Sequence, residues 1–283
     1  MTRILHLSDL HFGFERKQLV GPLLGLVNRM RADLVVVTGD LTHRGRPGQY
    51  RRAAEFLGQI TAPVMAVPGN HDVPLYNIPV RFLIPYRNYE QAVSPDLSPT
   101  RQAGDVRVFG VNSVDPFAVQ RGILRPKDIA GLIAGLDPLA TNIVALHHPL
   151  EQLPQVDKEL ARNAPQSLAS MAQAGVHIAL SGHLHLCDTN KLMAITAHPE
   201  ILQVQAGTAL CDRAGDLQNE FTVLEIDGTE LTIERHIAPM DQQGFQPPLL
   251  QRYSRAAGVW VALDEDTETP TLPGATETVF NTA

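Results

Sequence analysis

Residues 34–40 read Leu-Val-Val-Val-Thr-Gly-Asp, an unbroken apolar and β-branched run that stops at a glycine and an aspartate. A run of this kind is typical of a strand that is covered on both faces. Residues 17–31, before the run, carry apolar side chains at helical spacing, and residues 48–59, after it, also favour a helix. A strand set between two helices predicts an α/β fold around a buried sheet.

The same alternation of short strands and helices continues through the first two thirds of the chain. Further strands are predicted over residues 3–7, 64–67, 106–112, 142–146 and 178–181, and further helices over residues 127–135 and 165–174. After Gly182 the pattern changes to closely spaced strands over residues 201–205, 221–226 and 230–236. Because Asp227-Gly228 is a hairpin signal, we expect the chain to finish in a more antiparallel sheet.

Two stretches lack a clear periodicity. Residues 73–104 hold five prolines and three tyrosines, and we expect an ordered loop that covers a cavity. We expect residues 1–236 to form one domain, followed by a partly flexible C-terminal extension over residues 237–283. Within this extension, residues 259–263 favour a docking strand, whereas the acidic residues 264–277 are typical of a surface tail.

Composition excludes several classes of protein. The 283-residue chain has 23 Lys and Arg against 30 Asp and Glu, and its net charge of −7 disfavours binding to long nucleic acids. No apolar run approaches the roughly 18 residues that a membrane span needs, and no apolar leader follows Met1, so we expect a cytoplasmic protein. The two cysteines, Cys187 and Cys211, are expected to be reduced thiols.

Side chains that commonly bind metals recur where the predicted strands end. The five blocks are Asp9-Leu10-His11, Gly39-Asp40, Gly69-Asn70-His71-Asp72, His147-His148-Pro149 and Gly182-His183-Leu184-His185. Ligands of open α/β sheets bind beyond the carboxyl ends of the strands, so the five blocks are expected to meet at one edge. A helix cap or a surface histidine would explain any one block, but not the same chemistry at five strand ends.

The spacing within the blocks also favours a common site. Residues i and i+2 of an extended segment point the same way, so Asp9 with His11, and His183 with His185, are expected to converge. The glycine before Asp40 allows a sharp turn and a close backbone approach. Carboxylate, carboxamide and imidazole ligands without a thiolate suit Mn, Fe or Zn, so we predict a site for such divalent ions.

In order and spacing, the blocks D-x-H, G-D, G-N-H-D, H and G-H-x-H resemble the calcineurin-like metallophosphoesterase superfamily over residues 9–185. The resemblance implies a four-layer α-β-β-α sandwich of two mixed sheets, with a dinuclear metal site at the carboxyl ends of the strands. The strand-rich stretch after Gly182 fits the second sheet of that sandwich. By its length and its C-terminal extension, the chain resembles the class III cyclic-nucleotide phosphodiesterase group within the superfamily.

The resemblance also assigns roles to particular residues. The first divalent metal ion would be held by Asp9, His11, Asp40 and His185, and the second by Asp40, Asn70, His147 and His183. Asp40 would therefore bridge the two ions. The ligand lies two residues before the proline of its block, which selects His147 over His148. His71 matches the general acid of the family, and Asp72 matches the residue that orients it.

These roles imply hydrolysis of a small phosphodiester, such as a cyclic nucleotide, by a hydroxide that bridges the two metal ions. His71 would protonate the leaving alkoxide. Two alternatives remain within the superfamily, a phosphomonoesterase and a pyrophosphatase of the UDP-diacylglucosamine type. The second typically has arginine at the position of His71. A remote alternative is a non-catalytic metal-binding scaffold.

Candidate substrate contacts flank the metal-ligand blocks, namely His43, Arg44, Arg46, Tyr76 and His148. Arg44 and Arg46 are suited to clamping a second phosphate, because guanidinium groups bind phosphate with two parallel hydrogen bonds. Tyr76 is suited to stacking on a base or an aromatic leaving group. The expected partner is a small phosphodiester rather than a long nucleic acid or a membrane, and a homo-oligomer remains open.

Overall fold

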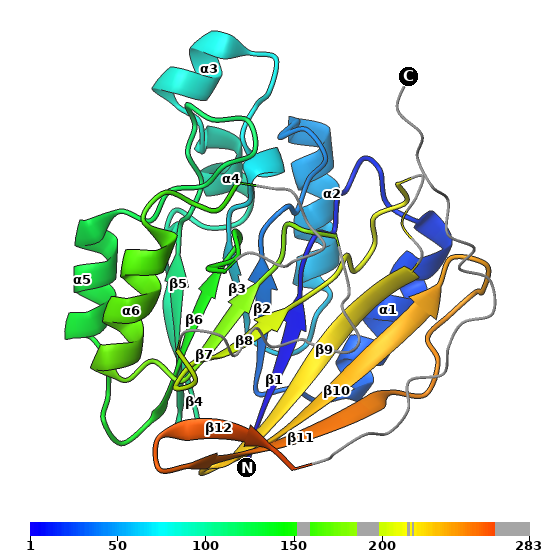
Figure 1. The fold of residues 1–283 in the computed structure, drawn as a ribbon. Helices are drawn as coiled ribbons and strands as arrows, with labels where there is room; N and C mark the ends of the chain where they lie inside the picture. The colour runs from blue at the N-terminus through cyan, green and yellow to red at the C-terminus, as the bar shows by residue number, and fades with distance from the viewer. Residues whose placement is uncertain (152–158, 186–197, 214–215, 217, 264–283) are drawn as a thin grey trace, which may run out of the picture.

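The computed structural model describes residues 1–151, 159–185, 198–213, 216 and 218–263. Two mixed β-sheets lie face to face, and helices cover the outer face of each, which gives the expected four-layer α-β-β-α sandwich (Figure 1). The strand order is β12-β11-β10-β9-β1-β2-β3 in the seven-stranded sheet and β4-β5-β6-β7-β8 in the five-stranded sheet.

The seven-stranded sheet combines both ends of the described chain. Its parallel strands are β1 (Thr2–Leu7), β2 (Leu34–Thr38) and β3 (Val64–Val67). Its antiparallel strands are β9 (Gln218–Asp227), β10 (Glu230–Pro239), β11 (Leu249–Ala256) and β12 (Val259–Ala262). Helices α1 (Lys17–Arg29) and α2 (Pro47–Gly58) pack on its outer face.

The five-stranded sheet is mostly parallel. Its strands are β4 (Thr100–Ala103), β5 (Val106–Val111), β6 (Thr141–Leu146), β7 (Ile178–Ser181) and β8 (Leu202–Gln205), of which only β4 pairs antiparallel. Helices α5 (Pro126–Ala134) and α6 (Ala164–Ala174) cover its outer face. Gly175 follows the end of α6 and has a left-handed conformation with φ of 101°.

Alternation along the strands divides the apolar core into layers. In β2, Val35 and Val37 pack against α1 and α2, whereas Leu34 and Val36 face the second sheet. In β6, Ile143 lies between the sheets and Val144 packs under α5 and α6. Because the strands are buried on both faces, their sequences read as unbroken apolar runs, which is why the sequence predicts them.

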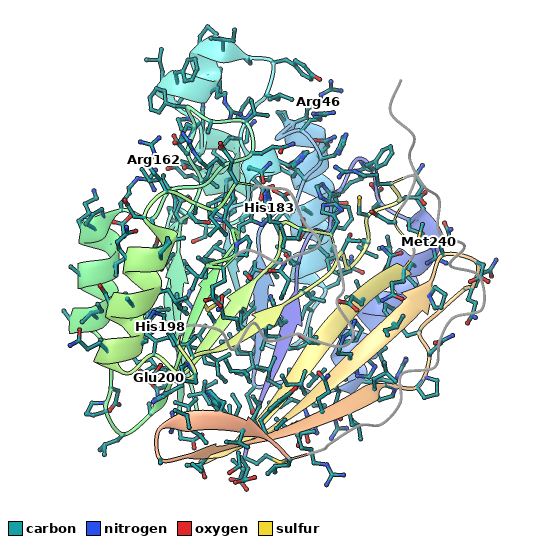
Figure 2. All side chains as sticks on the ribbon, in the orientation of Figure 1. Arg46, Arg162, His183, His198, Glu200 and Met240 are labelled. Carbon is teal, nitrogen blue, oxygen red and sulfur yellow. The ribbon has the colours of Figure 1, made fainter. Side chains whose placement is uncertain are left out.

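The parallel strands of both sheets end at the same edge of the sandwich. Figure 2 shows His183, just after β7, at this edge, whereas His198 and Glu200, just before β8, lie at the opposite end of the strands. The loops after β1, β2, β3, β6 and β7 carry the five metal-ligand blocks. The sheets therefore bring together residues that are far apart in the sequence.

Residues 73–104 are more regular than the sequence indicated. They contain the short helices α3 (Ile78–Leu83) and α4 (Arg87–Ala92) and strand β4. The buried Arg81 fixes α3 to the rest of the fold, because its guanidinium donates to the carbonyl oxygens of Pro116 (2.7 Å), Pro74 (3.2 Å) and Ala118. Helices of six residues are too short to show helical periodicity.

The C-terminal part of the chain also differs from expectation. The domain was expected to end at residue 236, but β10, β11 and β12 carry the seven-stranded sheet on to Ala262. The predicted docking strand at 259–263 is β12, and its buried Trp260 packs between the sheets. The predicted acidic tail over 264–277, and Cys187, lie outside the described residues, whereas Cys211 is buried with a free thiol. No helix within the described ranges is long and apolar enough to cross a bilayer.

Candidate metal centre

The polar residues at the carboxyl ends of the strands have an unusual backbone. Non-glycine residues rarely adopt positive φ, yet Asp9 (53°), His11 (46°), Asp40 (50°), His183 (76°) and His185 (57°) all do. The predicted reason for their convergence, alternation along an extended segment, is therefore wrong. Each side chain instead leaves the strand through a left-handed turn, a strained conformation that is typical of functional sites.

Close backbone approach at the site depends on Gly39 and Gly69. A Cβ atom on Gly39, which has φ of 89°, would lie 2.7 Å from Nδ1 of His147 and 2.8 Å from the backbone of Gly69. A Cβ atom on Gly69 would collide with the carboxylate and backbone of Asp40. The two glycines therefore let the loops after β2 and β3 pack directly against each other, as the sequence predicted for Gly39.

Four of the predicted ligands form a first donor group. One ligand atom from each of Asp9, His11, Asp40 and His185 lies within 4.8 Å of the others. The Nε2 atoms of His11 and His185 are 3.0 Å apart, and Oδ1 of Asp9 lies 3.2 Å from Nε2 of His185. Oδ2 of Asp40 lies 3.6 Å from Nε2 of His11. These are the residues assigned to the first metal ion.

A second donor group surrounds Nε2 of His147. This atom lies 3.0 Å from Oδ1 of Asn70, 3.3 Å from Nδ1 of His183 and 3.4 Å from Oδ2 of Asp40. The opposite ring nitrogen, Nδ1, donates to the carbonyl oxygen of Thr38 at 2.8 Å, which turns Nε2 toward the group. Because Oδ2 of Asp40 faces both donor groups, Asp40 has the position expected of the bridging ligand.

The charges of these buried groups are strongly coupled. Burial alone would raise the pKa of Asp9, but the positive charges of the neighbouring histidines, His185 first, hold it well below its usual range. The pKa of Asp40 is likewise held low, because the charges of His147 and His71 outweigh its burial. Against their burial, the carboxylates raise the pKa of His147 to about 9 and that of His185 to about 12. Two buried carboxylates thus attract positive charge.

The donor set fits divalent cations. Oδ1 of Asp9 and Nδ1 of His11 are buried without a hydrogen-bond partner, and unpaired buried polar atoms are costly in the absence of a ligand. Several ring nitrogens also face each other at 3.0–3.3 Å, within reach of the carboxylates. Imidazole, carboxylate and carboxamide donors are suited to Mn, Fe or Zn. The negative charge of the two buried carboxylates can be balanced either by protons on His147 and His185 or by cations between the donors.

His71 lies at the rim of the donor groups. Its ring centroid is 4.9 Å from that of His11, and its backbone N–H donates to Oδ1 of Asp40 at 2.8 Å. Nδ1 of His71 donates to the carbonyl oxygen of His43 at 2.8 Å. Because a carbonyl can only accept, Nδ1 keeps its proton and Nε2 is left for proton exchange.

Among the described residues no hydrogen bond joins Asp72 to the ring of His71, in contrast to the orienting role that the resemblance implies. Its buried carboxylate accepts hydrogen bonds from the backbone N–H groups of Leu41 (3.1 Å), Thr42 (2.9 Å) and Gly69 (2.9 Å). Asp72 therefore holds together the loops that carry Asp40 and Asn70, and the orientation of His71 comes from the His43 carbonyl. Burial and the charge of Asp40 raise the pKa of Asp72 to about 7.

His148 and His43 differ in their freedom to bind a ligand. Both ring nitrogens of His148 are engaged, at 2.8 Å from Oγ of Ser113 and 2.9 Å from the carbonyl oxygen of Gln120. Burial lowers the pKa of His148 to about 3, so it is a neutral packing residue rather than a free substrate contact. The ring of His43 is stacked between those of Phe14 and His71 and faces a pocket.

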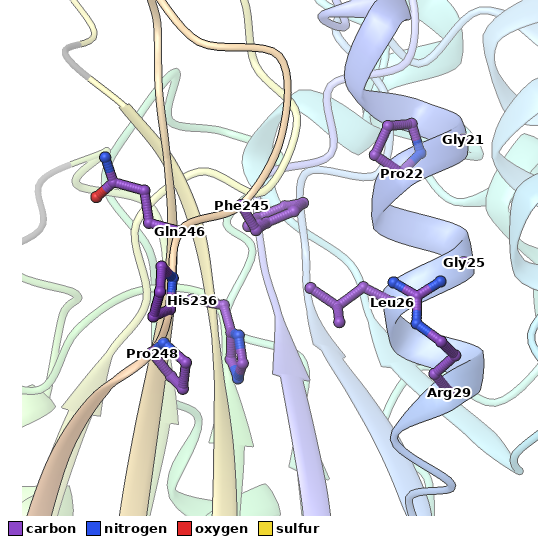
Figure 3. A pocket seen from close by; sticks show the side chains of 10 residues that line it. Gly21, Pro22, Gly25, Leu26, Arg29, His236, Phe245, Gln246 and Pro248 are labelled. Carbon is purple, nitrogen blue, oxygen red and sulfur yellow. The ribbon is translucent and has the colours of Figure 1, made fainter.

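This pocket has a volume of about 230 Å³ and lies beside His71. Of the remaining candidate substrate contacts, Arg44 lines it, and Tyr76 packs its ring against the Arg44 guanidinium at 5.5 Å. Arg46, labelled in Figure 2 at the start of α2, is exposed and does not line the pocket. A second groove of about 470 Å³, between α1 and the segment after β10, contains none of the predicted site residues (Figure 3).

Two contributors to the site were missed in the sequence. Arg213, in the loop after β8, lines the pocket, and the carbonyl oxygen of Val119 lies 3.4 Å from Nδ2 of Asn70, which leaves Oδ1 facing the donor group. The rule that functional loops follow the carboxyl ends of parallel strands extends to β8 and could have indicated Arg213. No sequence pattern marks Val119, because it acts through its backbone.

Comparison with curated proteins gives partial matches. The chain is 38% identical over 82 residues to the glycerophosphodiester phosphodiesterase GpdQ of Enterobacter lignolyticus, covering 24% of this chain and 29% of that protein. It is 25% identical over 167 residues to a probable cyclic nucleotide phosphodiesterase of Synechococcus, covering 58% and 62% of the two chains. The chain thus spans less than two thirds of the length of both relatives.

Among solved structures, the purple acid phosphatase PPD1 of yellow lupin, Lupinus luteus, superposes with a TM-score of 0.59 at 15% identity. The match covers 88% of this chain and 53% of the lupin chain, and it shows a shared fold. Residues 2–187 match the sequence model of the calcineurin-like phosphoesterases, and this segment contains all five metal-ligand blocks. Because the match spans more than half of its length, the chain belongs to the calcineurin-like phosphoesterase family.

Proposed function

We propose that this chain is a metal-dependent phosphodiesterase that hydrolyses small phosphodiesters, with cyclic nucleotides and glycerophosphodiesters as the leading classes. The observation that carries the proposal is the pair of donor groups that share Asp40, with His71 at their rim. Family membership and the similarity to proteins named as phosphodiesterases support a diester substrate.

Two divalent ions, which we propose to be Mn, Fe or Zn, would be held by the two donor groups. When bound, they would supply an activated water as nucleophile and neutralise charge on the phosphoryl oxygens. Asp40 is the residue that would contact both ions. Nδ2 of Asn70 donates to the carbonyl oxygen of Val119, so Oδ1 of Asn70 faces the second donor group. The carbonyl oxygen of Thr38 fixes the ring of His147 in the orientation that a ligand needs.

His71 is the proposed general acid. Its Nδ1–H group is held by the His43 carbonyl, so Nε2 is the atom that would carry a proton to the departing alkoxide oxygen. The rest of the substrate would extend into the neighbouring pocket, which His71 and Asn70 both line. Asp72 keeps the two loops in register and takes no direct part in proton transfer.

The test is turnover of bis(p-nitrophenyl) phosphate and of p-nitrophenyl phosphate by the purified protein with Mn²⁺, Fe²⁺ or Zn²⁺. We expect the diester to be the better substrate. His71→Ala should lower kcat by roughly 10²–10⁴-fold, the usual contribution of a general acid, on a diester with an alkoxide leaving group such as glycerophosphoethanolamine, while the protein keeps its metal content. The nitrophenyl esters should be affected less, because p-nitrophenolate is stable enough to leave without a proton. Metal content is measured by atomic emission on the same samples.

His177→Ala is the matched control, because His177 lies at the opposite end of β7, where its Nδ1 accepts from the backbone of Asn142. This variant should keep full turnover. A wild-type protein that binds the metals but hydrolyses neither ester contradicts the proposal and favours a non-catalytic scaffold. Full activity of His71→Ala on the diester with the alkoxide leaving group would show that another group is the acid.

A further inference from the structure

The pocket beside His71 is lined by three chemically different kinds of residue. Its lining includes His71 and Asn70, which adjoin the donor groups, and it also includes the two cations Arg44 and Arg213. Val73, Leu75 and Val119 form the apolar wall of the same pocket. Arg44 comes from the loop after β2 and Arg213 from the loop after β8, so the two cations reach one pocket from different sheets.

Neither arginine is paired with a carboxylate among the described residues. Within the described part of the chain, no carboxylate lies within ion-pair distance of Arg44 or Arg213, and no acidic residue lines the pocket. Both arginines instead lie close enough to the ring of His43 to oppose its protonation. After burial, the Arg44 charge is the largest of the effects that lower the pKa of His43 to about 4, and Arg213 adds to it.

Arg44 is also held in place on its other side. Its guanidinium lies over the ring of Tyr76, 5.5 Å from the centroid, and its backbone N–H donates to Oε1 of Gln49 at 2.9 Å. A guanidinium held in this way loses less conformational entropy when it binds an anion than a free side chain does. The planar group offers two parallel N–H donors to a carboxylate or a phosphate.

We propose that Arg44 and Arg213 form an anion subsite that binds a second negatively charged group of the substrate, so that preferred substrates are phosphodiesters bearing an additional carboxylate or phosphate. This inference rests on the proposed function, because it places the scissile diester at the donor groups next to His71. The apolar wall then contacts the carbon linker between the two anions. In this role Arg213 replaces the exposed Arg46, which was the second arginine of the predicted clamp.

The test compares two natural diesters that differ by one carboxylate, glycerophosphoserine and glycerophosphoethanolamine. With the Mn²⁺-loaded wild type, we expect kcat/KM to be about tenfold higher for glycerophosphoserine, as one charge-assisted contact at a partly exposed site provides. Arg44→Gln and Arg213→Gln should each reduce this ratio toward one. Arg46→Gln, the matched control from the same loop, should keep the wild-type ratio.

A second measurement reports binding without turnover. Titration calorimetry with the same Mn²⁺-loaded proteins compares phosphoglycerate with glycerol phosphate, which again differ by one carboxylate. We expect phosphoglycerate to bind about tenfold more tightly to the wild type, and this difference to disappear in Arg44→Gln and Arg213→Gln. If neither glycerophosphodiester is turned over, this calorimetric comparison alone tests the anion subsite.

The inference is overturned if the wild type does not discriminate between the paired ligands, or if both Arg→Gln variants keep the discrimination. Turnover of bis(p-nitrophenyl) phosphate separates this outcome from a failure of the proposed function. Turnover of this ester without discrimination between the paired ligands disproves only the anion subsite. Tighter phosphoglycerate binding without turnover of any diester supports the subsite and contradicts the phosphodiesterase.

Discussion

The space between the two sheets and the edge where their strands end contrast sharply in backbone and in charge. Between the sheets, Ile4, Val36 and Ile143 follow ordinary strand alternation and are fully or almost fully buried in apolar surroundings. Where the same sheets end, Asp9, Asp40 and His183 have positive φ and bring buried polar atoms together. The difference teaches that the interior supplies the stability of the fold, while the edge retains a costly arrangement suited to binding.

The strongest test of this contrast is Asp40→Asn at the edge. Since Oδ2 of Asp40 faces both donor groups, we expect loss of bound metal and a decrease in kcat/KM on the order of a thousandfold, from several kcal/mol of lost charge stabilisation. The fold should persist, because asparagine tolerates left-handed backbone and can still accept from the His71 N–H group. Metal content, kcat/KM and circular dichroism are measured together, and wild-type metal content would refute the bridging role.

Ile143→Ala tests the interior. This side chain is fully buried between the sheets, so its truncation should lower the free energy of unfolding by about 3 kcal/mol. The folded variant should keep kcat/KM within about twofold of the wild type, because its metal-binding edge is unchanged. Urea unfolding is the measurement, and Ile133→Ala on the half-buried side of α5 is the control with a smaller expected loss. If Ile143→Ala lost as much activity as Asp40→Asn, the proposed difference between the interior and the edge would be contradicted.

His6 sharpens the comparison, because it is an imidazole placed between the sheets instead of at the edge. Its Nε2 lies 2.8 Å from Oγ1 of Thr38, and burial, opposed by the charge of Asp9, lowers its pKa to about 3. The His6 imidazole takes up a proton near pH 6.5 in the unfolded chain but not in the folded chain. The stability that the neutral ring contributes is therefore full above pH 6.5 and is lost as pH falls toward 3.

Between pH 6.5 and 5, His6 alone should therefore lower the free energy of unfolding by about 2 kcal/mol. The measurement is urea unfolding across this range, compared between the wild type and His6→Asn. The variant should show a flatter dependence on pH. Parallel curves for the two proteins would mean that His6 does not titrate as its burial implies.

The smallest expected effect concerns strain away from the edge. Ala257, between β11 and β12, also has positive φ (51°), but it lies far along the sequence from any metal-ligand block. Ala257→Gly should raise stability by up to about 1 kcal/mol, because glycine adopts this conformation without a steric cost. Thermal unfolding measures the gain, and Ala256→Gly in the adjacent strand should instead lose stability. A destabilised Ala257→Gly would show that its positive φ is not strained.

The interior was predictable from the sequence to a degree that the edge was not. Runs such as residues 34–38 are unbroken because both faces of β2 are covered, so strand positions could be inferred, while the four-layer arrangement was implied by the family resemblance. The left-handed turns at Asp9 and Asp40 could not, because a single residue leaves no periodic signal for its own φ angle. The identity of the ligand residues came from a family resemblance, and the structure brings them together for reasons that alternation did not supply.

Elements outside the periodic core could not be predicted from the sequence either. The helices α3 and α4 have six residues each, too few for a pattern, and β11 alternates so weakly that it was expected to be an extension. Asp72 was assigned a partner by motif, whereas most of its hydrogen bonds come from a neighbouring loop, through the backbone N–H groups of Leu41 and Thr42 and the Thr42 hydroxyl. Backbone partners depend on how loops pack, which residue identities do not encode directly.

The two sheets contribute to the edge in nearly equal measure, with Asp9, Asp40 and Asn70 from one and His147 and His183 from the other. Each donor group therefore joins elements that would separate if the sandwich opened. Cations held there would bind only the closed arrangement and would therefore stabilise it. The stabilisation follows mass action and is about 2.7 kcal/mol when the free cation concentration is a hundred times Kd. The thermal stability of the protein would then report the supply of metal in its surroundings.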